Sequence, residues 1–209
     1  LIELQKYGLP YEPTVQESIK AGVDVVTFST DKLLGGPQGG IIAGKKKWIE
    51  PLKKNPLTRA LRVGKLTIAA LEATLRLYLE EELALKNIPV LKMILTPLET
   101  IEERCKKVIN KVSSETRVCM NLSIVDGFSE MGGGALPGEG IPTRRISLHS
   151  EKVDANEIAA QLRANMPPIF ARIEQDRVLL DMRTVYDDAE IGMIAVALEK
   201  IAGFSENCG

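Results

Sequence analysis

A lysine placed soon after an apolar strand is the feature that most constrains the fold of this sequence. Residues 23–28 (Val-Asp-Val-Val-Thr-Phe) are mainly β-branched or apolar, which suits a strand buried on both faces of a parallel sheet. Lys32 follows, and glycines at 35, 36, 39 and 40 allow a sharp turn into a returning strand at 41–43. Since short motifs are weak evidence, the pattern alone is also compatible with an ordinary turn whose lysine is solvated.

The position of Lys32 points to a particular chemistry. An ammonium group beside a buried strand is costly unless it is paired, neutral or covalently bound. A lysine in a dry pocket has a lowered pKa, and its free amine can condense with an aldehyde. One large enzyme class holds pyridoxal 5'-phosphate (PLP) through a lysine in such a place, so Lys32 is the candidate for that role.

The residues around Lys32 also carry a family resemblance. Residues 29–40 read Ser-Thr-Asp-Lys-Leu-Leu-Gly-Gly-Pro-Gln-Gly-Gly, which closely resembles the cofactor-lysine segment of bacterial selenocysteine synthases, the L-seryl-tRNA(Sec) selenium transferases. The resemblance extends through 56–62 (Pro-Leu-Thr-Arg-Ala-Leu-Arg) and 66–79. It starts at 7–10 (Tyr-Gly-Leu-Pro) and reaches the last helix more loosely.

The resemblance implies an α/β fold, the C-terminal part of a fold-type-I PLP-dependent transferase. Residues 1–92 would be the C-terminal part of the PLP-binding large domain, ending in a long helix. Residues 93–209 would be a small α+β domain. The chain lacks an initiator methionine, and we expect it to be the C-terminal half of a longer protein. A small N-terminal tRNA-binding domain and the first half of the cofactor domain would then be missing.

Local patterns predict the elements in more detail. In the first part, hydrophobic spacing predicts a long helix over 67–86 with Thr67 as its cap, broken at 87–89. In the second part the order is helix, strand, glycine loop, strand, helix, hairpin and helix, which favours an antiparallel sheet with helices on one side. The predicted ranges are strands at 23–29 and 40–44, a helix at 45–52, a helix from 96 or 97 to 112, a strand at 117–125, a loop at 132–142, a strand at 146–149, a helix capped by Asp154 through 165, a hairpin at 169–174 and 178–182, and a last helix from 187 to 201.

Three residues form the predicted cofactor site. Lys32 would hold the cofactor and then act as the free amine that moves the substrate's α-proton. Asp31 would orient substrate or assist that proton transfer, although a turn residue is an equal alternative. Ser29 matches a serine that donates to the cofactor phosphate in many fold-type-I enzymes, and a local strand-end hydrogen bond is its alternative.

A basic segment follows this site. Residues 45–65 contain eight Lys or Arg and one Glu, net +7, in a chain whose formal net charge is −1. The local field favours anions, although Lys45–Lys54 also fit a solvated helix face. Arg59 and Arg62, spaced i and i+3, would share a face on one helical turn and could clamp a tetrahedral anion. In the resembled family the matching arginines line the site expected for the phosphorylated selenium donor.

Several other classes of function are disfavoured. Gly39, Gly44 and Lys45 imitate a phosphate-binding loop, but Lys46 stands where such a loop needs Ser or Thr. His149 is the only histidine, which argues against a histidine triad or a multi-histidine metal site, and we expect no metal.

No apolar run approaches the roughly 18–20 residues of a membrane span, and the scattered Cys105, Cys119 and Cys208 fit reduced thiols in a cytoplasmic protein. The arginines at 144, 145 and 183 are expected to be ion-pair residues first and substrate or RNA contacts second.

The resemblance therefore predicts PLP-dependent conversion of seryl-tRNA(Sec) to selenocysteinyl-tRNA(Sec). Water would be eliminated from the seryl group and selenium would be added from selenophosphate. The implied assembly is a homo-oligomer built from dimers. Two alternatives stay open at this point. One is a related PLP-dependent lyase that acts on a phosphorylated amino acid or amino sugar acid, and the other is a non-catalytic fragment. We expect the chain alone to be inactive and to bind PLP weakly.

Overall fold

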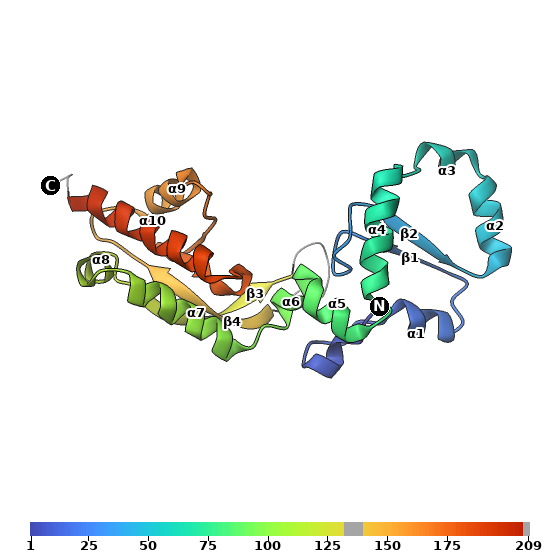
Figure 1. Ribbon diagram of the computed structural model, residues 1–209, viewed down its shortest axis with the longest axis horizontal. Coiled ribbons are helices and arrows are strands. Elements are labelled where there is room, and N and C mark those ends of the chain that lie inside the picture. The colour runs from blue at the N-terminus through green and yellow to red at the C-terminus, as the bar shows by residue number, and fades with distance from the viewer. Residues whose placement is uncertain (132–139, 207–209) are drawn as a thin grey trace. The chain divides into compact units, whose positions relative to one another are not determined.

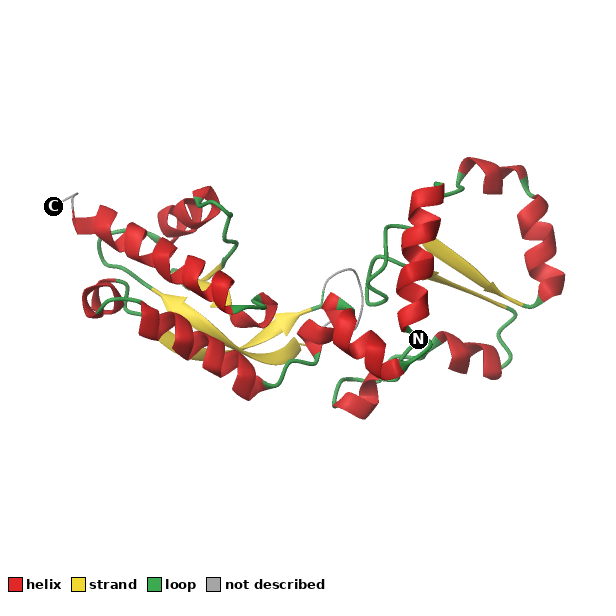
Figure 2. Cartoon of the chain, viewed as in Figure 1, coloured by secondary structure: helices red, strands yellow, loops and turns green. Residues whose placement is uncertain are grey.

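The computed structural model describes residues 1–131 and 140–206, which form two compact units that both combine helices with strands (Figures 1 and 2). The N-terminal unit is built from Leu1–Leu95 and the C-terminal unit from Thr96–Ser129 with the chain from Gly140 onward. Residues 132–139, most of the predicted glycine loop, lie outside the described residues, and Gly140–Pro142 belong to a strand.

Helices make up most of the N-terminal unit. Its elements in chain order are η1 (Leu4–Tyr7), α1 (Val15–Lys20), β1 (Val25–Ser29), β2 (Gly40–Gly44), α2 (Lys46–Lys54), α3 (Pro56–Ala60), α4 (Lys65–Leu77), α5 (Glu81–Asn87) and α6 (Pro89–Ile94). α1 packs against β1, and α2 packs against β2. The two predicted strands and the predicted helix after them are confirmed.

The two strands form an antiparallel hairpin in register from Val25–Gly44 to Ser29–Gly40. The expectation of a strand buried on both faces is wrong for the described residues, because β1 pairs only with β2 there and no residue of either strand is buried. Helices α2, α3 and α4 also contain no buried residue. Large apolar side chains on α3 and α4, such as Leu57 and Leu66, are 66% and 80% exposed.

The predicted long helix over 67–86 is wrong, because it is two helices. α4 ends at Leu77, and the backbone N–H groups of Tyr78, Leu79 and Glu80 each bond a carbonyl three residues earlier. This tight i→i−3 pattern closes the helix, and the backbone of Glu80 is extended. The predicted cap is also wrong, because Thr67 lies inside α4 and Gly64 occupies the N-cap without a side-chain bond.

The C-terminal unit is a four-stranded sheet covered by helices. Its elements are α7 (Leu98–Lys111), α8 (Ser114–Cys119), β3 (Ser123–Glu130), β4 (Gly140–Leu148), α9 (Ala155–Ala164), β5 (Arg172–Glu174), β6 (Arg177–Asp181), η2 (Met182–Thr184) and α10 (Asp188–Glu206). The strand order is β3-β4-β6-β5. β6 pairs antiparallel with both β4 and β5.

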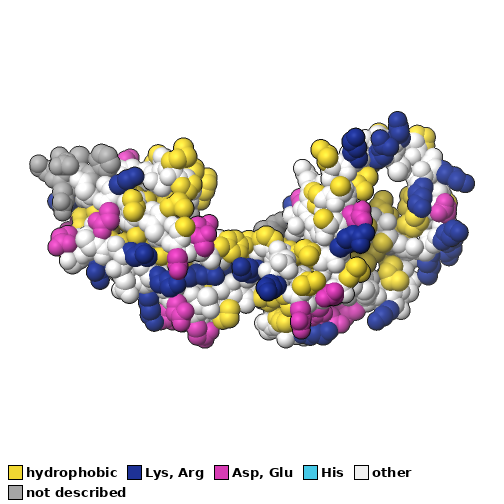
Figure 3. All heavy atoms as spheres, viewed as in Figure 1, with side chains coloured by type: hydrophobic (Ala, Val, Ile, Leu, Met, Phe, Trp, Pro, Cys, Tyr) yellow, Lys and Arg dark blue, Asp and Glu magenta, His cyan; other side chains and the backbone are white. Residues whose placement is uncertain are grey.

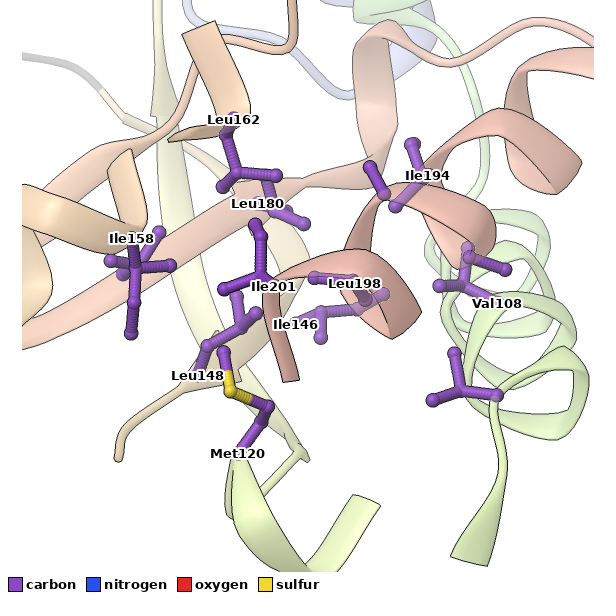
Figure 4. Close-up of a cluster of buried hydrophobic side chains, with 14 of the residues drawn as sticks. Val108, Met120, Ile146, Leu148, Ile158, Leu162, Leu180, Ile194, Leu198 and Ile201 are labelled. Carbon is purple, nitrogen blue, oxygen red and sulfur yellow. The ribbon is translucent and has the colours of Figure 1, made fainter. Parts of the chain in front are cut away.

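One face of this sheet carries the main core. Ile146 pairs with Leu180, and Leu148 pairs with Val178. Paired residues and residues two apart along a strand share a face of the sheet, so all four side chains lie on the same face. All four are buried together with residues of α7, α9 and α10. Figure 4 labels Ile146, Leu148 and Leu180 among side chains of those helices. The predicted packing of helices on one side of an antiparallel sheet is confirmed.

Local signals in this unit had mixed outcomes. The Asp154 side chain caps α9 by accepting from the N–H groups of Asn156 and Glu157, as predicted. The predicted hairpin is present, and its turn residues Gln175 and Asp176 have positive φ. The predicted start of a strand at 117 is wrong, because a Ser113 cap initiates α8 and strand β3 begins only at Ser123.

Candidate cofactor-lysine site

The turn between β1 and β2 is fastened from inside by Thr30. Its side chain is fully buried and donates to the Pro37 carbonyl, while its N–H bonds the Gly39 carbonyl at 3.0 Å. The Thr30 carbonyl in turn accepts from the Gly36 N–H at 2.7 Å. The hairpin register and this residue together fix the two ends of the turn that carries Lys32.

Gly35 is required by the shape of this turn. Its φ is +69°, a left-handed conformation that costs other residues free energy. A Cβ on Gly35 would lie 2.5 Å from Ile88 Cγ2, which belongs to the buried junction of α5 and α6. Its N–H bonds the Lys32 carbonyl at 2.8 Å, so this glycine closes the turn directly after the lysine.

Lys32 is paired and half exposed. Its Nζ lies 3.3 Å from Asp31 Oδ2, and the two side chains are 45% and 28% exposed. The expectation of a dry pocket is therefore wrong for the described residues, since the strand before Lys32 is covered only in part. Solvent screens an ion pair between two side chains at this exposure.

A cleft of about 260 Å³ adjoins the lysine. Lys32, Ser29 and Tyr78 line it together with the apolar side chains of Phe28 and Leu34. An amine can bind an aldehyde, a hydroxyl can donate to a phosphate, and apolar side chains can contact a flat ring. The chemistry of this lining fits PLP.

The two predicted anion-binding arginines are not part of this cleft. Arg59 lies in α3, which ends at Ala60, and Leu61 is its C-cap, so Arg62 lies beyond the helix. The prediction that they share one helical turn is therefore wrong. Both side chains are exposed, and neither lines the cleft with Lys32.

The rest of the basic segment is largely a solvated face (Figure 3). Lys45 and Lys47 pair with Asp24 at 2.8 and 3.8 Å, and Lys53 pairs with Glu50 at 3.4 Å. Gly44 ends β2 as the partner of Val25 and approaches the Asp24 backbone too closely for a Cβ. Its role is strand packing, which agrees with the rejection of a phosphate-binding loop.

The arginines of the C-terminal unit have structural partners. Arg144 pairs with Asp126 at 2.7 Å, and Arg145 pairs with Glu174 at 3.2 Å, as expected. Arg183 is buried and donates to the carbonyls of Thr96 and Pro142.

The His149 backbone N–H bonds the Met120 carbonyl at 2.9 Å, and its ring Nδ1 lies 3.3 Å from the Asp176 carbonyl oxygen. Among the described residues, no group of three or more His, Cys, Asp or Glu could hold a metal ion.

Sequence reasoning missed the contribution of Tyr78. Its hydroxyl donates to the carbonyls of Leu34 at 3.0 Å and Leu33 at 3.3 Å, the two residues after the lysine. Burial raises the pKa of Tyr78 to about 12. The only signal was a tyrosine near the end of an apolar helical pattern, and that pattern predicted a helix continuing through it.

The fold and the site define a mixed helix-and-sheet protein whose candidate nucleophile is a turn lysine at a cleft. The family model of SelA, L-seryl-tRNA selenium transferase, matches residues 1–186. The chain therefore belongs to the L-seryl-tRNA selenium transferase family.

Curated relatives agree with this assignment. The L-seryl-tRNA(Sec) selenium transferase of Alkaliphilus metalliredigens is 52% identical over 97% of this chain and 43% of its own length. The proteins of the same name from Alkaliphilus oremlandii and Clostridium botulinum are 53% and 47% identical, over 88% and 90% of this chain. The chain spans about two fifths of the length of these relatives.

Among solved structures, a ureidoglycine–glyoxylate aminotransferase from Bacillus subtilis covers 91% of this chain and 49% of its own, with 14% identity and a TM-score of 0.35. At that TM-score the match adds nothing to the assignment. Among the described residues, no helix is both long enough and apolar enough to cross a membrane.

Proposed function

We propose that this chain is the cofactor-lysine part of a longer selenium transferase that converts L-seryl-tRNA(Sec) to selenocysteinyl-tRNA(Sec) with PLP and selenophosphate. The observation that carries the proposal is the Lys32 amine at a cleft it shares with Ser29, in a turn that belongs to a family-matched segment. The relatives that bear the selenium transferase name are more than twice as long as the part matched here.

Three side chains would act on the cofactor and substrate. Lys32 would hold PLP, and the Ser29 hydroxyl would donate a hydrogen bond to its phosphate. When bound, PLP withdraws electrons from the substrate's α-carbon, so that the α-proton becomes acidic and the β-hydroxyl can leave as water. Released from the cofactor, the Lys32 amine would take the α-proton, and the Asp31 carboxylate 3.3 Å away would stabilise the resulting ammonium.

Arg59 and Arg62 would bind the selenium donor. Selenophosphate is a small multivalent anion, and guanidinium groups bind such anions with charge-assisted hydrogen bonds. Cleavage of its selenium–phosphorus bond uses one water and releases phosphate, which balances the water lost from serine. Both side chains extend into solvent in this chain. We place the donor beside them and infer that they serve a cleft completed by other parts of the protein.

The exposed apolar surface supports a larger assembly. Ile68, Leu71, Leu75 and Leu79 line one open apolar groove along α4, and Ile68 and Leu79 are 52% and 80% exposed. An exposed apolar patch of this kind marks a protein interface. We infer that further chain and a second subunit cover α3 and α4 in a cytoplasmic homo-oligomer. The phosphorylated-sugar lyase is not favoured, since the relatives described above are named selenium transferases.

The test compares two lysine substitutions in the full-length protein. Lys32→Ala should abolish the visible absorption of lysine-bound PLP and the formation of selenocysteinyl-tRNA. Lys45→Ala is the matched control, because Lys45 is also paired with an aspartate and is 50% exposed, and it should retain both. Retained absorption and activity in Lys32→Ala would refute the proposal. Loss of both in Lys45→Ala as well would show that the effect is not specific to the cleft.

A further inference from the structure

Tyr78 joins the lysine turn to a different part of the N-terminal unit. It occupies the C-cap of α4, and its hydroxyl reaches back to the carbonyls of Leu33 and Leu34. The other hydrogen bonds that residues 31–38 make with described residues lie within 30–39, the turn between β1 and β2, as in the Gly35 bond to Lys32. Among the described residues, the tyrosine therefore makes the hydrogen bonds that fix this turn to another element.

The same side chain faces the candidate site. Tyr78 lines the cleft together with Lys32, Ser29 and Leu34. Its hydroxyl has one proton, which it shares between two consecutive carbonyls at 3.0 and 3.3 Å. Burial raises the pKa of Tyr78 to about 12, so the hydroxyl stays a donor throughout the pH range in which enzymes work.

Restraint of these carbonyls restrains the lysine. The Lys32 carbonyl accepts from Gly35, so residues 32–35 form one closed turn. A rotation of the Leu33 or Leu34 peptide would turn the Lys32 backbone with it and change the direction of its side chain. The half-exposed lysine pairs with its own neighbour Asp31, and a pair between adjacent residues cannot anchor the turn to the rest of the unit.

We propose that Tyr78 is a positioning residue, whose hydroxyl holds the Leu33 and Leu34 carbonyls and thereby aims the Lys32 amine into the cleft. The proposal rests on the assignment of Lys32 as the cofactor lysine. It assigns Tyr78 no contact with substrate and no proton transfer.

The test uses Tyr78→Phe in the full-length protein, with Tyr7→Phe as its matched control. Tyr7 also donates one hydrogen bond, to Glu81 at 2.6 Å, but it lies outside the cleft. Loss of a hydrogen bond worth about 1 kcal/mol corresponds to an increase of about fivefold in a dissociation constant. We expect Tyr78→Phe to raise the PLP dissociation constant by about that factor and to shift the pH at which the absorption of lysine-bound PLP changes. Tyr7→Phe should leave both quantities unchanged.

Two readouts separate positioning from stability. Far-UV circular dichroism melts should be similar for the two variants, and amide exchange at Gly35 and Gly36 should accelerate only in Tyr78→Phe. If Tyr78→Phe does not fold, a fluorinated tyrosine at position 78 keeps the ring and hydroxyl while lowering the hydroxyl pKa. PLP retention should then fall as that hydroxyl ionises, and retention that does not change with pH would overturn the proposal.

Failure of this proposal can be distinguished from failure of the assignment. If Lys32→Ala loses the cofactor absorption while Tyr78→Phe matches the wild type in affinity, pH dependence and amide exchange, the positioning role is wrong and the assignment stands. If Lys32→Ala itself retains the absorption, the assignment fails, and the positioning role fails with it.

Discussion

Replacing Gly35 by alanine tests the turn that presents Lys32. At φ +69° an alanine costs about 1–2 kcal/mol of backbone strain. Its Cβ would also lie 2.5 Å from Ile88 Cγ2, and such overpacking costs typically about 1–3 kcal/mol. The sum predicts that Gly35→Ala lowers the free energy of unfolding by about 2–5 kcal/mol.

Gly8→Ala separates the two contributions. Gly8 has φ +79°, with nothing within 4 Å of its Cβ position, so alanine there should cost only the strain, about 1–2 kcal/mol. The assay is urea unfolding followed by the fluorescence of Trp48, which is the single tryptophan and lies in the same unit. Equal losses in the two variants would show that the contact with Ile88 does not limit the turn. No loss in Gly35→Ala would refute the left-handed turn itself.

A double substitution probes the same contact from the other side. Ile88 is 1% exposed, so Ile88→Ala alone should cost about 2–5 kcal/mol. In the Gly35→Ala, Ile88→Ala double variant the new methyl group occupies space that the isoleucine has left. The losses of unfolding free energy in the two single variants should therefore sum to more than the loss in the double variant, by about 1–3 kcal/mol. Strict additivity would contradict the proposed overlap.

The remaining predictions concern the core, acid stability and the donor anion. Leu198→Ala, at 0% exposure in α10, should lower the free energy of unfolding by about 2–5 kcal/mol, while Val196→Ala on the exposed side of that helix should change it by less than about 0.5 kcal/mol. Hydrogen bonds from the N-terminus of α8 hold the pKa of Glu199 below its usual value, although burial opposes them. The contribution of the Glu199 carboxylate to the free energy of unfolding is therefore complete above the ordinary glutamate pKa. It is lost as pH falls through the lowered pKa of the folded state. Melts between pH 7 and 3 should show that Glu199→Gln is less stable than the wild type near neutrality and loses less stability than the wild type on acidification. Parallel curves of stability against pH for the two proteins would contradict this. In the full-length protein, Arg59→Ala with Arg62→Ala should raise the selenophosphate concentration for half-maximal rate by about tenfold or more while leaving PLP absorption unchanged.

The sequence predicted elements whose signals are local. Asp154 predicted the start of α9, because a capping carboxylate acts on N–H groups two and three residues away. The hairpin after residue 169 was predicted from a polar turn between two apolar runs, and its turn residues have positive φ. The β-branched run before Lys32 predicted β1, and the glycines after it predicted a turn into β2.

The failures concern features that depend on distant residues. The apolar spacing of 67–86 continues across Tyr78, but that tyrosine bonds the turn at Leu33 and Leu34, and the helix closes there. Periodicity contains no information about such a contact. The burial of β1 was inferred from composition, although burial also depends on which elements cover a strand. The spacing of Arg59 and Arg62 predicted a shared helical face only on the assumption that α3 continues past Ala60.

Mapping the lysine that binds PLP would test the assignment of Lys32 as the cofactor lysine. The full-length protein would be loaded with PLP and reduced with borohydride, which makes the bond between lysine and cofactor permanent, and its peptides would be analysed by mass spectrometry. We predict that the reduced cofactor is found on Lys32 at near one per chain, with only traces on the exposed lysines of α2 and its cap. Labelling spread evenly over Lys45, Lys53 and Lys32, or concentrated on a lysine outside the cleft, would contradict it.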